Sequence, residues 1–163
     1  FRRVLFRSGE VFAANVGKVL NILEMTKITE VPKSPEYMKG VINLRGTVLP
    51  VIDTRIKFGM PPVEITNNTC ILVLEINIEN DYVQAGAIVD AVSEVIEIKN
   101  EEISPPPSIG NKYKSNFITG MAKRNDDFLM ILDMDKVFSL DELTDMSDLQ
   151  NQLSGMKDET LMH

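Results

Sequence analysis

The stretch Gly40–Met60 reads GVINLRGTVLPVIDTRIKFGM and carries the local signals from which the fold is predicted. Two β-branched, apolar runs, Val41–Leu44 and Thr47–Ile52, flank the turn sequence Asn43–Gly46. Asparagine favours the first position of a type I turn through its side-chain hydrogen bond, and glycine at the last position accepts the left-handed conformation of a bulge. The stretch therefore predicts a β-hairpin with Arg45 at its solvent-exposed tip.

Proline at position 50 constrains the second strand of this hairpin. Because proline has no backbone N–H to donate to a neighbouring strand, Pro50 predicts that its strand lies at a sheet edge or bulges there. Further short apolar runs at Cys70–Ile76, Gln84–Val89 and Val92–Ile98 are separated by polar turn sequences. Many short strands with frequent turns and no alternating helices indicate an all-β barrel or sandwich.

The length and charge of the chain limit its class. Its 163 residues suffice for one substantial core or for two small lobes that share a face. No apolar run approaches the roughly 20 residues that a membrane span requires, which predicts no direct membrane insertion. The formal net charge of -7 argues against nucleic acid as a partner, because affinity for phosphates depends on clustered Lys and Arg. The expected partners are proteins.

Residues for catalysis or metal binding are scarce. The only histidine is His163, so a histidine triad, a histidine general base and a histidine metal site are all excluded. The acidic pairs Glu101/Glu102 and Asp126/Asp127 lie in predicted loops, where solvated carboxylates are common. Glycine-rich phosphate loops and a CxxC pair are absent, so the sequence predicts no enzyme and no cofactor.

The C-terminal part of the chain changes to helical periodicity. Ser139 and Glu142 form a capping box, and apolar residues then recur at spacings of three and four up to Met156. The sequence therefore predicts an amphipathic helix after the β-rich part, with residues 144–163 as the C-terminal helix and a frayed tail.

The hairpin stretch resembles the signature of the CheW-like domain family, Lys/Arg-Gly-Val-x-Asn-Leu-Arg-Gly-x-x-x-Pro-Val-x-Asp-Leu-Arg-x-x-Phe. It departs from this signature at Thr54, where the family usually has leucine. Three further segments, Thr29–Pro32, Gly86–Val92 and Ile131–Lys136, resemble other family motifs in the same order. The positions that match the signature are Lys39, Gly40, Val41, Asn43, Leu44, Arg45, Gly46, Pro50, Val51, Asp53, Arg55 and Phe58.

The resemblance covers roughly residues 11–143 and implies an all-β fold of two packed, five-stranded SH3-like β-barrel lobes with a groove between them. The CheW-like domain is placed at residues 9–143, with the boundary between the lobes left open. Residues 1–8 contain three arginines and no acidic residue, and Ser8 stands where the family has a core leucine. We predict that they are a non-native segment, such as a cloning or assembly scar.

The resemblance also implies a chemotaxis adaptor that works by contact alone. Such a scaffold couples the cytoplasmic tips of chemoreceptors, the methyl-accepting chemotaxis proteins, to the regulatory domain of the histidine kinase CheA in bacterial signal transduction. It would be cytoplasmic and recruited to membrane receptor arrays through its partners. Asn21 replaces the glutamate of a family Val-x-Glu-Ile motif at a partner-binding surface. The residues expected to bind receptor or kinase are Val19, Asn21, Ile22, Gly40, Arg45, Gly46 and Ile71.

Two alternatives to a stand-alone adaptor remain open. The first is the same module cut from a CheV or CheA chain. The second and weaker alternative is an OB-like β-barrel that binds a small ligand or nucleic acid. An OB-like barrel predicts exposed aromatic residues among basic ones. In this chain only 6% of all residues are aromatic, and acidic residues outnumber basic ones.

Overall fold

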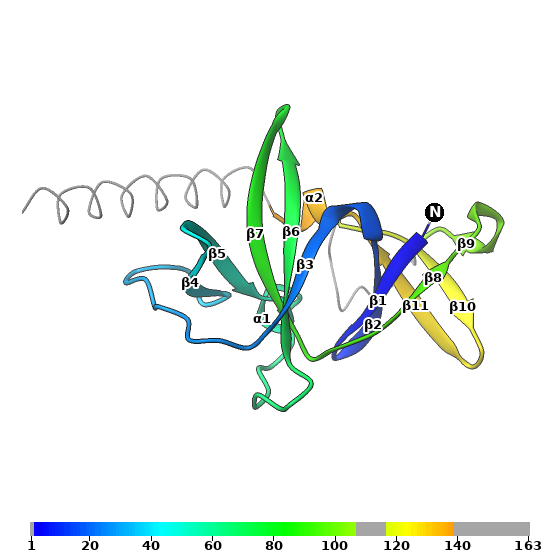
Figure 1. The fold of residues 1–163 in the computed structure, drawn as a ribbon. Coiled ribbons are helices and arrows are strands. Elements are labelled where there is room, and N and C mark those ends of the chain that lie inside the picture. Colours follow the sequence, from blue (N-terminus) through cyan, green and yellow to red (C-terminus); the bar gives the residue numbers. More distant parts are fainter. Residues whose placement is uncertain (1, 107–116, 139–163) are drawn as a thin grey trace, which may run out of the picture.

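The structure is a computed structural model that describes residues 2–106 and 117–138 (Figure 1). In these residues the strands form two sheets, which we call the first lobe and the second lobe. The first lobe has five strands in the order β3 (Val19–Glu24), β6 (Cys70–Ile78), β7 (Asp81–Val89), β5 (Thr47–Asp53) and β4 (Met38–Leu44). The second lobe has six in the order β8 (Ala91–Glu97), β1 (Arg2–Ser8), β2 (Glu10–Asn15), β11 (Asp127–Leu132), β10 (Ile118–Arg124) and β9 (Ile103–Ser104).

Helical structure is limited to single turns in the described residues. These are η1 (Val16–Lys18), α1 (Thr54–Lys57), η2 (Asn100–Glu102) and α2 (Met134–Val137). None of the described helices is long and apolar enough to cross a membrane. The predicted capping box at Ser139 and the predicted helix and tail of residues 144–163 lie outside the described residues.

The two lobes are not consecutive halves of the chain. β1 and β2 pair with each other, and β2 then runs parallel to β11, with Phe12 opposite Met130. The N-terminal hairpin therefore completes a sheet made otherwise of C-terminal strands, and the first lobe is inserted between them. The predicted all-β, two-lobed fold is confirmed. The second lobe has a sixth strand because the two-residue β9 pairs with β10.

Strand β6 lies at the centre of the molecule and is covered on both faces. Because successive side chains of a strand point to opposite faces, Ile71 and Val73 pack inside the first lobe, whereas Leu72 and Leu74 face the second lobe. The layer between the lobes is the largest buried cluster of the described residues. Each lobe also has a smaller interior cluster of its own. Since the largest apolar layer belongs to both lobes, we expect them to unfold together.

Phenylalanine rings connect the two lobes within this layer. The ring centroid of Phe12 lies 5.7 Å from that of Phe6 and 4.8 Å from that of Phe58, which directly follows α1. Phe58 is in turn 5.1 Å from Phe117, just before β10. Aromatic pairs are favourable at centroid separations of about 4.5–7 Å, so these rings add to the apolar burial between the lobes.

The carboxylate of Asp135 in α2 adds a polar link to β6. Its Oδ1 accepts hydrogen bonds from Asn77 N at 2.9 Å and from Lys18 Nζ at 3.1 Å, and Lys18 Nζ lies 3.0 Å from Oδ2. β3 pairs with β6 only as far as Leu74. Beyond that point, the Asp135 carboxylate takes the place of a strand partner along the outer edge of β6.

Pro50 predicted a sheet edge or a bulge. Its strand is internal, so the sheet-edge position is wrong, and the pairing of β5 with β4 shifts register close by, between Met38 and Gly40. β5 has β4 on one side and β7 on the other. Val41, opposite Pro50, directs its N–H and C=O to Thr29, at 2.8 and 2.9 Å, and not towards Pro50. On the other side, the parallel ladder with β7 begins only at Val51. The missing N–H is therefore tolerated because neither neighbouring strand uses it.

Residues 2–8 form strand β1 between β8 and β2, so in the structure they belong to the second lobe. Ser8 is fully buried, and its hydroxyl lies 2.6 Å from that of Thr54, which donates to the Ile88 carbonyl oxygen at 2.6 Å. Arg3 fits less well: its Nε is buried without a hydrogen-bond partner among the described residues, and burial lowers the pKa of its guanidinium. The non-native origin of residues 1–8 stays a prediction.

Candidate functional site

The β4–β5 turn presents Arg45 to solvent in a fixed backbone conformation. Leu44 pairs with Thr47, so the turn has only two central residues, and both have positive φ: 52° at Arg45 and 85° at Gly46. Positive φ at both positions is the pattern of a type I′ turn, whose twist matches that of the paired strands. The predicted four-residue type I turn with a bulge is therefore wrong in type, although the hairpin and its exposed tip are confirmed.

Asn43 nevertheless forms the side-chain hydrogen bond within the turn that the sequence predicted. Its Oδ1 accepts a hydrogen bond from Gly46 N at 2.9 Å and so closes the turn from the side chain. No heavy atom lies within 4 Å of the position that a Cβ on Gly46 would occupy. A Cβ at position 46 would thus meet open space, so Gly46 is required for its backbone angle alone.

Gly40 has a structural role at the start of β4. Its φ is +143°, and a Cβ there would collide with the backbone carbonyl of Thr29. Thr29 forms an isolated antiparallel bridge with Val41, which holds the segment after β3 against β4. Gly40 therefore allows the close approach of two backbones, and nothing in its surroundings requires a partner protein.

Strand β3 forms one edge of the first lobe and exposes an apolar strip. Leu20 and Ile22 are 46% and 48% exposed, whereas Val19 and Asn21 are partly buried. The pairing with β6 shifts register between Val19 and Asn21, which is a bulge at Leu20. Asn21 Oδ1 accepts from Ile22 N at 2.9 Å, so the residue that replaces the family glutamate binds its own strand. The strip offers side chains to a partner.

Ile71 cannot contact a partner directly. It has no exposed surface and packs in the interior of the first lobe. Leu23 of β3 and Leu44 beside the turn pack against the same buried cluster. Ile71 therefore supports the strand and the turn from inside. Leu20 is exposed but was not among the binding residues expected from the sequence motif.

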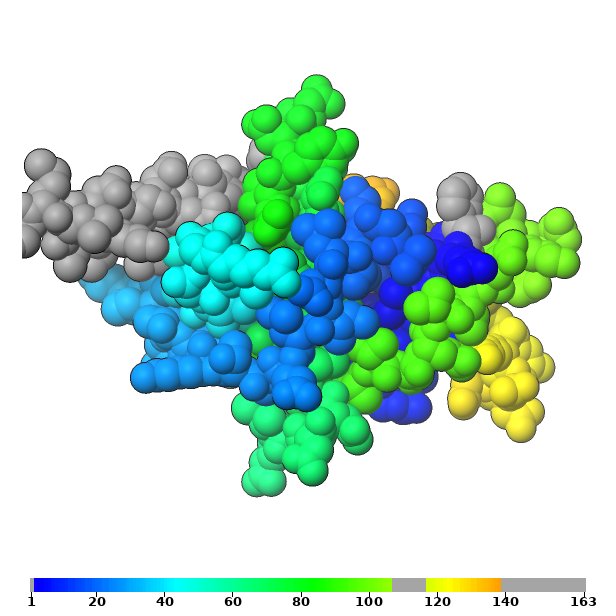
Figure 2. Space-filling view, in the orientation of Figure 1, coloured from blue at the N-terminus to red at the C-terminus, as the bar shows by residue number. Residues whose placement is uncertain are grey.

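The apolar strip and the turn occur on the same lobe. Figure 2 shows the blue atoms of β3 and the cyan atoms of the β4–β5 hairpin on the face turned to the viewer. Because Leu23 and Leu44 share one buried cluster, both elements are anchored in the same core. The structure thus combines an apolar edge and an exposed arginine on one rigid lobe, which suits recognition of a protein surface.

A cavity of about 250 Å³ lies elsewhere on the first lobe and was not predicted. Its lining includes Met25, Ile28, Val63 and Ile65, together with charged side chains. Val63 and Ile65 are 53% and 65% exposed on the loop after α1, where isolated apolar residues in a polar loop give no periodic signal in sequence.

An ion pair at this cavity joins the two lobes. Arg55 Nε donates to both carboxylate oxygens of Asp90, at 2.9 and 3.1 Å, and Gly9 N donates to Asp90 Oδ2 at 3.1 Å. Asp53 Oδ1 accepts from Arg55 N at 2.9 Å as the cap of α1. Asp53 and Arg55 belong to the family signature, and Asp90 belongs to a further family motif. In this structure their contacts hold the ends of strands in place.

The described residues offer little chemistry. They contain no group of His, Cys, Asp and Glu side chains suited to holding a metal ion. Burial raises the pKa of the Cys70 thiol, and a hydrogen bond with the Val92 backbone offsets this only in part. A raised pKa disfavours the reactive thiolate.

Comparisons with known proteins identify the family. The CheW-like domain family matches residues 3–142. The chain is 34% identical to the chemotaxis protein CheW of Bacillus subtilis over 91% of this chain and 92% of that protein. It is 32% identical to the chemotaxis protein CheW of Klebsiella aerogenes, over 82% and 78%. By contrast, its match to the chemotaxis protein CheV3 of Helicobacter pylori, at 29% identity, covers only 44% of that protein.

A solved structure supports the same assignment. The crystal structure of the scaffolding protein TtCheW from Thermoanaerobacter tengcongensis matches with a TM-score of 0.76 and 32% identity, over 86% of this chain and 89% of that one. The two-lobed β fold, the hairpin signature and the near full-length relatives agree, and they leave neither an enzyme nor an OB-like barrel as an alternative. The chain belongs to the CheW-like domain family of non-catalytic chemotaxis scaffold proteins.

Proposed function

We propose that this scaffold joins the cytoplasmic tip of a chemoreceptor to the regulatory domain of the histidine kinase CheA, and that the first lobe carries both contacts. Arg45 would bind the receptor, and the β3 strip of Leu20 and Ile22 would bind the kinase. The protein would be cytoplasmic and would reach the membrane array only through these partners.

The observation that carries the proposal is the exposed apolar strip on a strand edge. Leu20 and Ile22 are each about half exposed, although neighbouring strands bury nearly all residues of this size. Apolar side chains held on a rigid element form the buried centre of protein interfaces. The bulge at Leu20 and the Asn21 side chain occupy the strand edge, which favours contact through side chains over addition of a further strand.

The test is a reconstituted mixture of receptor, kinase and this protein, with receptor and kinase from the same source. Adding the protein should change kinase autophosphorylation only when receptor is present. Ile22→Lys should raise the concentration needed for half of this effect by about tenfold, as for a central interface residue. Val95→Lys is the matched control, because Val95 is 50% exposed on β8, an edge strand of the second lobe. Unchanged autophosphorylation at every protein concentration, or equal loss in both variants, would contradict the proposal.

Arg45→Ala should separate stability from binding. The side chain is exposed and alanine accepts the left-handed backbone about as poorly as arginine does, so the free energy of unfolding should change by less than about 0.5 kcal/mol. Receptor binding should weaken by about 1–2 kcal/mol if Arg45 is a central interface residue. Thermal melts and titration with a receptor-tip fragment measure the two quantities. If the variant binds receptor as the parent does, Arg45 is a solvated turn residue.

A further inference from the structure

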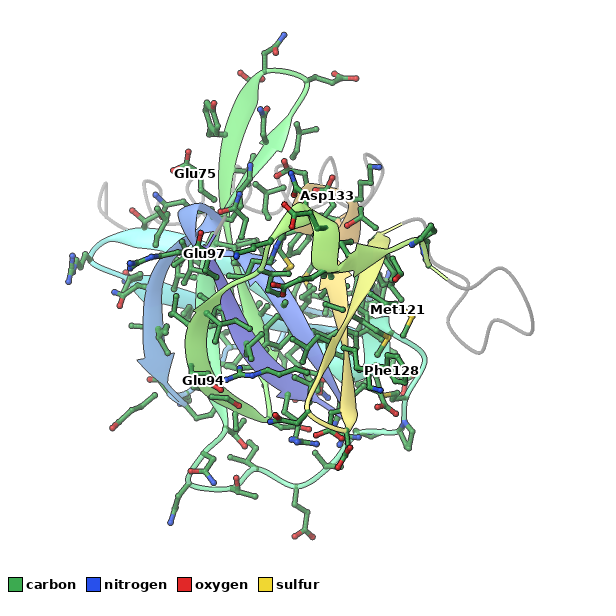
Figure 3. The ribbon with its side chains drawn as sticks, turned by 90° about the vertical axis from the view of Figure 1, so that its right-hand side faces the viewer. Glu75, Glu94, Glu97, Met121, Phe128 and Asp133 are labelled. Atoms are coloured by element: carbon green, nitrogen blue, oxygen red, sulfur yellow. The ribbon has the colours of Figure 1, made fainter. Side chains whose placement is uncertain are left out.

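The hairpin formed by β6 and β7 extends beyond the strands on either side of it. It projects from the body of the molecule in Figures 1 and 2, and Figure 3 shows it from another direction, with Glu75 labelled near its base. β3 covers β6 only as far as Leu74, and β5 pairs with β7 only at residues 86–88. Among the described residues, 75–78 of β6 and 81–85 of β7 therefore have no strand neighbour except each other.

The two outer edges of this projecting hairpin differ. Glu79 and Asn80 form a two-residue turn with φ of 47° and 72°, so Ile78 and Asp81 are the first hydrogen-bonded pair. Along the hairpin from there, hydrogen-bonded and non-hydrogen-bonded pairs alternate. Asn77 and Tyr82 then form a non-hydrogen-bonded pair, whose backbone groups point outward. Asn77 N does point outward, since it donates to Asp135 Oδ1 at 2.9 Å. The outward N–H of Asn77 on the β6 edge is thus paired with a carboxylate.

Within the part of the chain that the structure describes, the β7 edge has no strand partner before Gly86. By the same alternation, the N–H and C=O groups of Tyr82 and Gln84 point away from β6, towards the side on which β5 lies. β5 does not reach them, because its ladder with β7 begins at Val51, after a proline that has no N–H to donate. The Tyr82 and Gln84 side chains are exposed, and among the described residues the β5–β7 ladder covers only residues 86–88 of β7, so it includes neither residue.

We propose that this open edge of β7, residues 81–85, binds an extended, basic segment of a partner protein by strand addition. An unpaired edge offers two donors and two acceptors at the spacing of a strand. The charge selects the partner: residues 70–89 contain Glu75, Glu79 and Asp81 and no Lys or Arg. Like charge disfavours a second copy of this acidic chain, whereas alternating Lys or Arg on an added strand is attracted. The residues of this edge are different from those of the proposed receptor and kinase contacts, Arg45 and the β3 strip.

The experiment uses the full chain and a synthetic peptide, acetyl-Lys-Thr-Val-Lys-Val-Thr-Lys-amide, with a matched peptide in which Glu replaces each Lys. Amide hydrogen exchange is the direct readout. The Tyr82 and Gln84 amides should exchange rapidly in the free protein and become protected on binding of the basic peptide. The Val83 amide, which pairs with Ile76, should be protected in both states. The acidic peptide should protect neither edge amide.

Two hairpin variants separate backbone recognition from charge. Gln84→Pro removes an outward N–H without removing a bond to β6, and it should weaken peptide binding by about tenfold, while Gln84→Thr keeps the N–H and should bind as the parent does. Asp81→Lys leaves the backbone intact and should weaken the preference for the basic peptide, because Glu75 and Glu79 remain. Three results would overturn the proposal. The first is no saturable binding of the basic peptide at 1 mM in dilute salt, since ~1 mM is the weakest affinity expected for so short an interface. The others are equal binding of the peptide to Gln84→Pro and self-association of the parent through Tyr82 and Gln84.

Discussion

Replacing Gly40 by alanine should lower the free energy of unfolding by about 3–5 kcal/mol, the combined size of backbone strain and overpacking. The φ of +143° disfavours any residue with a Cβ, and that Cβ would meet the Thr29 carbonyl. The carbonyl cannot move away without loss of the bridge in which Val41 N donates to Thr29 O at 2.8 Å. Denaturant unfolding followed by circular dichroism measures the change.

Gly46→Ala is the matched control for this prediction. Its φ of +85° imposes strain, but no heavy atom lies near the added methyl group. The loss should therefore be about 1–2 kcal/mol, the penalty for an ordinary residue in the left-handed region. Equal losses at the two glycines would show that Thr29 adjusts freely. Any weaker receptor binding in the Gly40 variant should disappear when only the folded fraction is counted, because Gly40 acts through the fold.

Phe12→Ala should cost about 3–5 kcal/mol, as for large-to-small changes at fully buried aromatic residues. Phe12 is 1% exposed and contacts the Phe6 and Phe58 rings in the layer between the lobes. Because this layer belongs to both lobes, the variant should still unfold in one transition, at a lower temperature. Hydrogen exchange in β6 and β11 should become faster by the same factor.

Phe128→Ala provides the comparison for the loss of a phenylalanine ring. Phe128 lies at the start of β11 in the same sheet, labelled in Figure 3, and is 60% exposed. Its removal should change stability by less than about 0.5 kcal/mol. If Phe12→Ala instead gave two separate transitions, the lobes would be independent domains and the shared layer would not couple them.

Local signals in the sequence were sufficient to predict the hairpin around Arg45 and the protein family. The β-branched runs on either side of Arg45 predicted the hairpin and its exposed tip, and the turn residues needed only their nearest neighbours to do so. The ordered motifs around that hairpin carried the family resemblance, which the comparisons confirm. These features depend on residues close together in the chain, so a single sequence contains them.

Only the tertiary structure decided which residues of these elements meet solvent. β6 is apolar almost throughout because both of its faces are covered, so no alternation distinguishes Ile71, inside the first lobe, from Leu72, between the lobes. In β3, exposed residues alternate with partly buried ones, and Leu20 and Ile22 lie on the exposed side of this edge strand. Burial depends on strands that are distant in sequence.

The pairing partners of each strand were likewise beyond the reach of the sequence. Pro50 predicted a sheet edge or a bulge, yet β5 is internal. Its missing N–H is tolerated because Thr29 takes the hydrogen bonds of Val41 and the β7 ladder starts one residue later. The open edge at Tyr82 and Gln84 arises from the same arrangement. Local sequence determined that these segments are strands, turns and caps. Which backbone groups find partners was decided only when segments far apart in the chain came together, since a hydrogen bond between strands depends on the register of both.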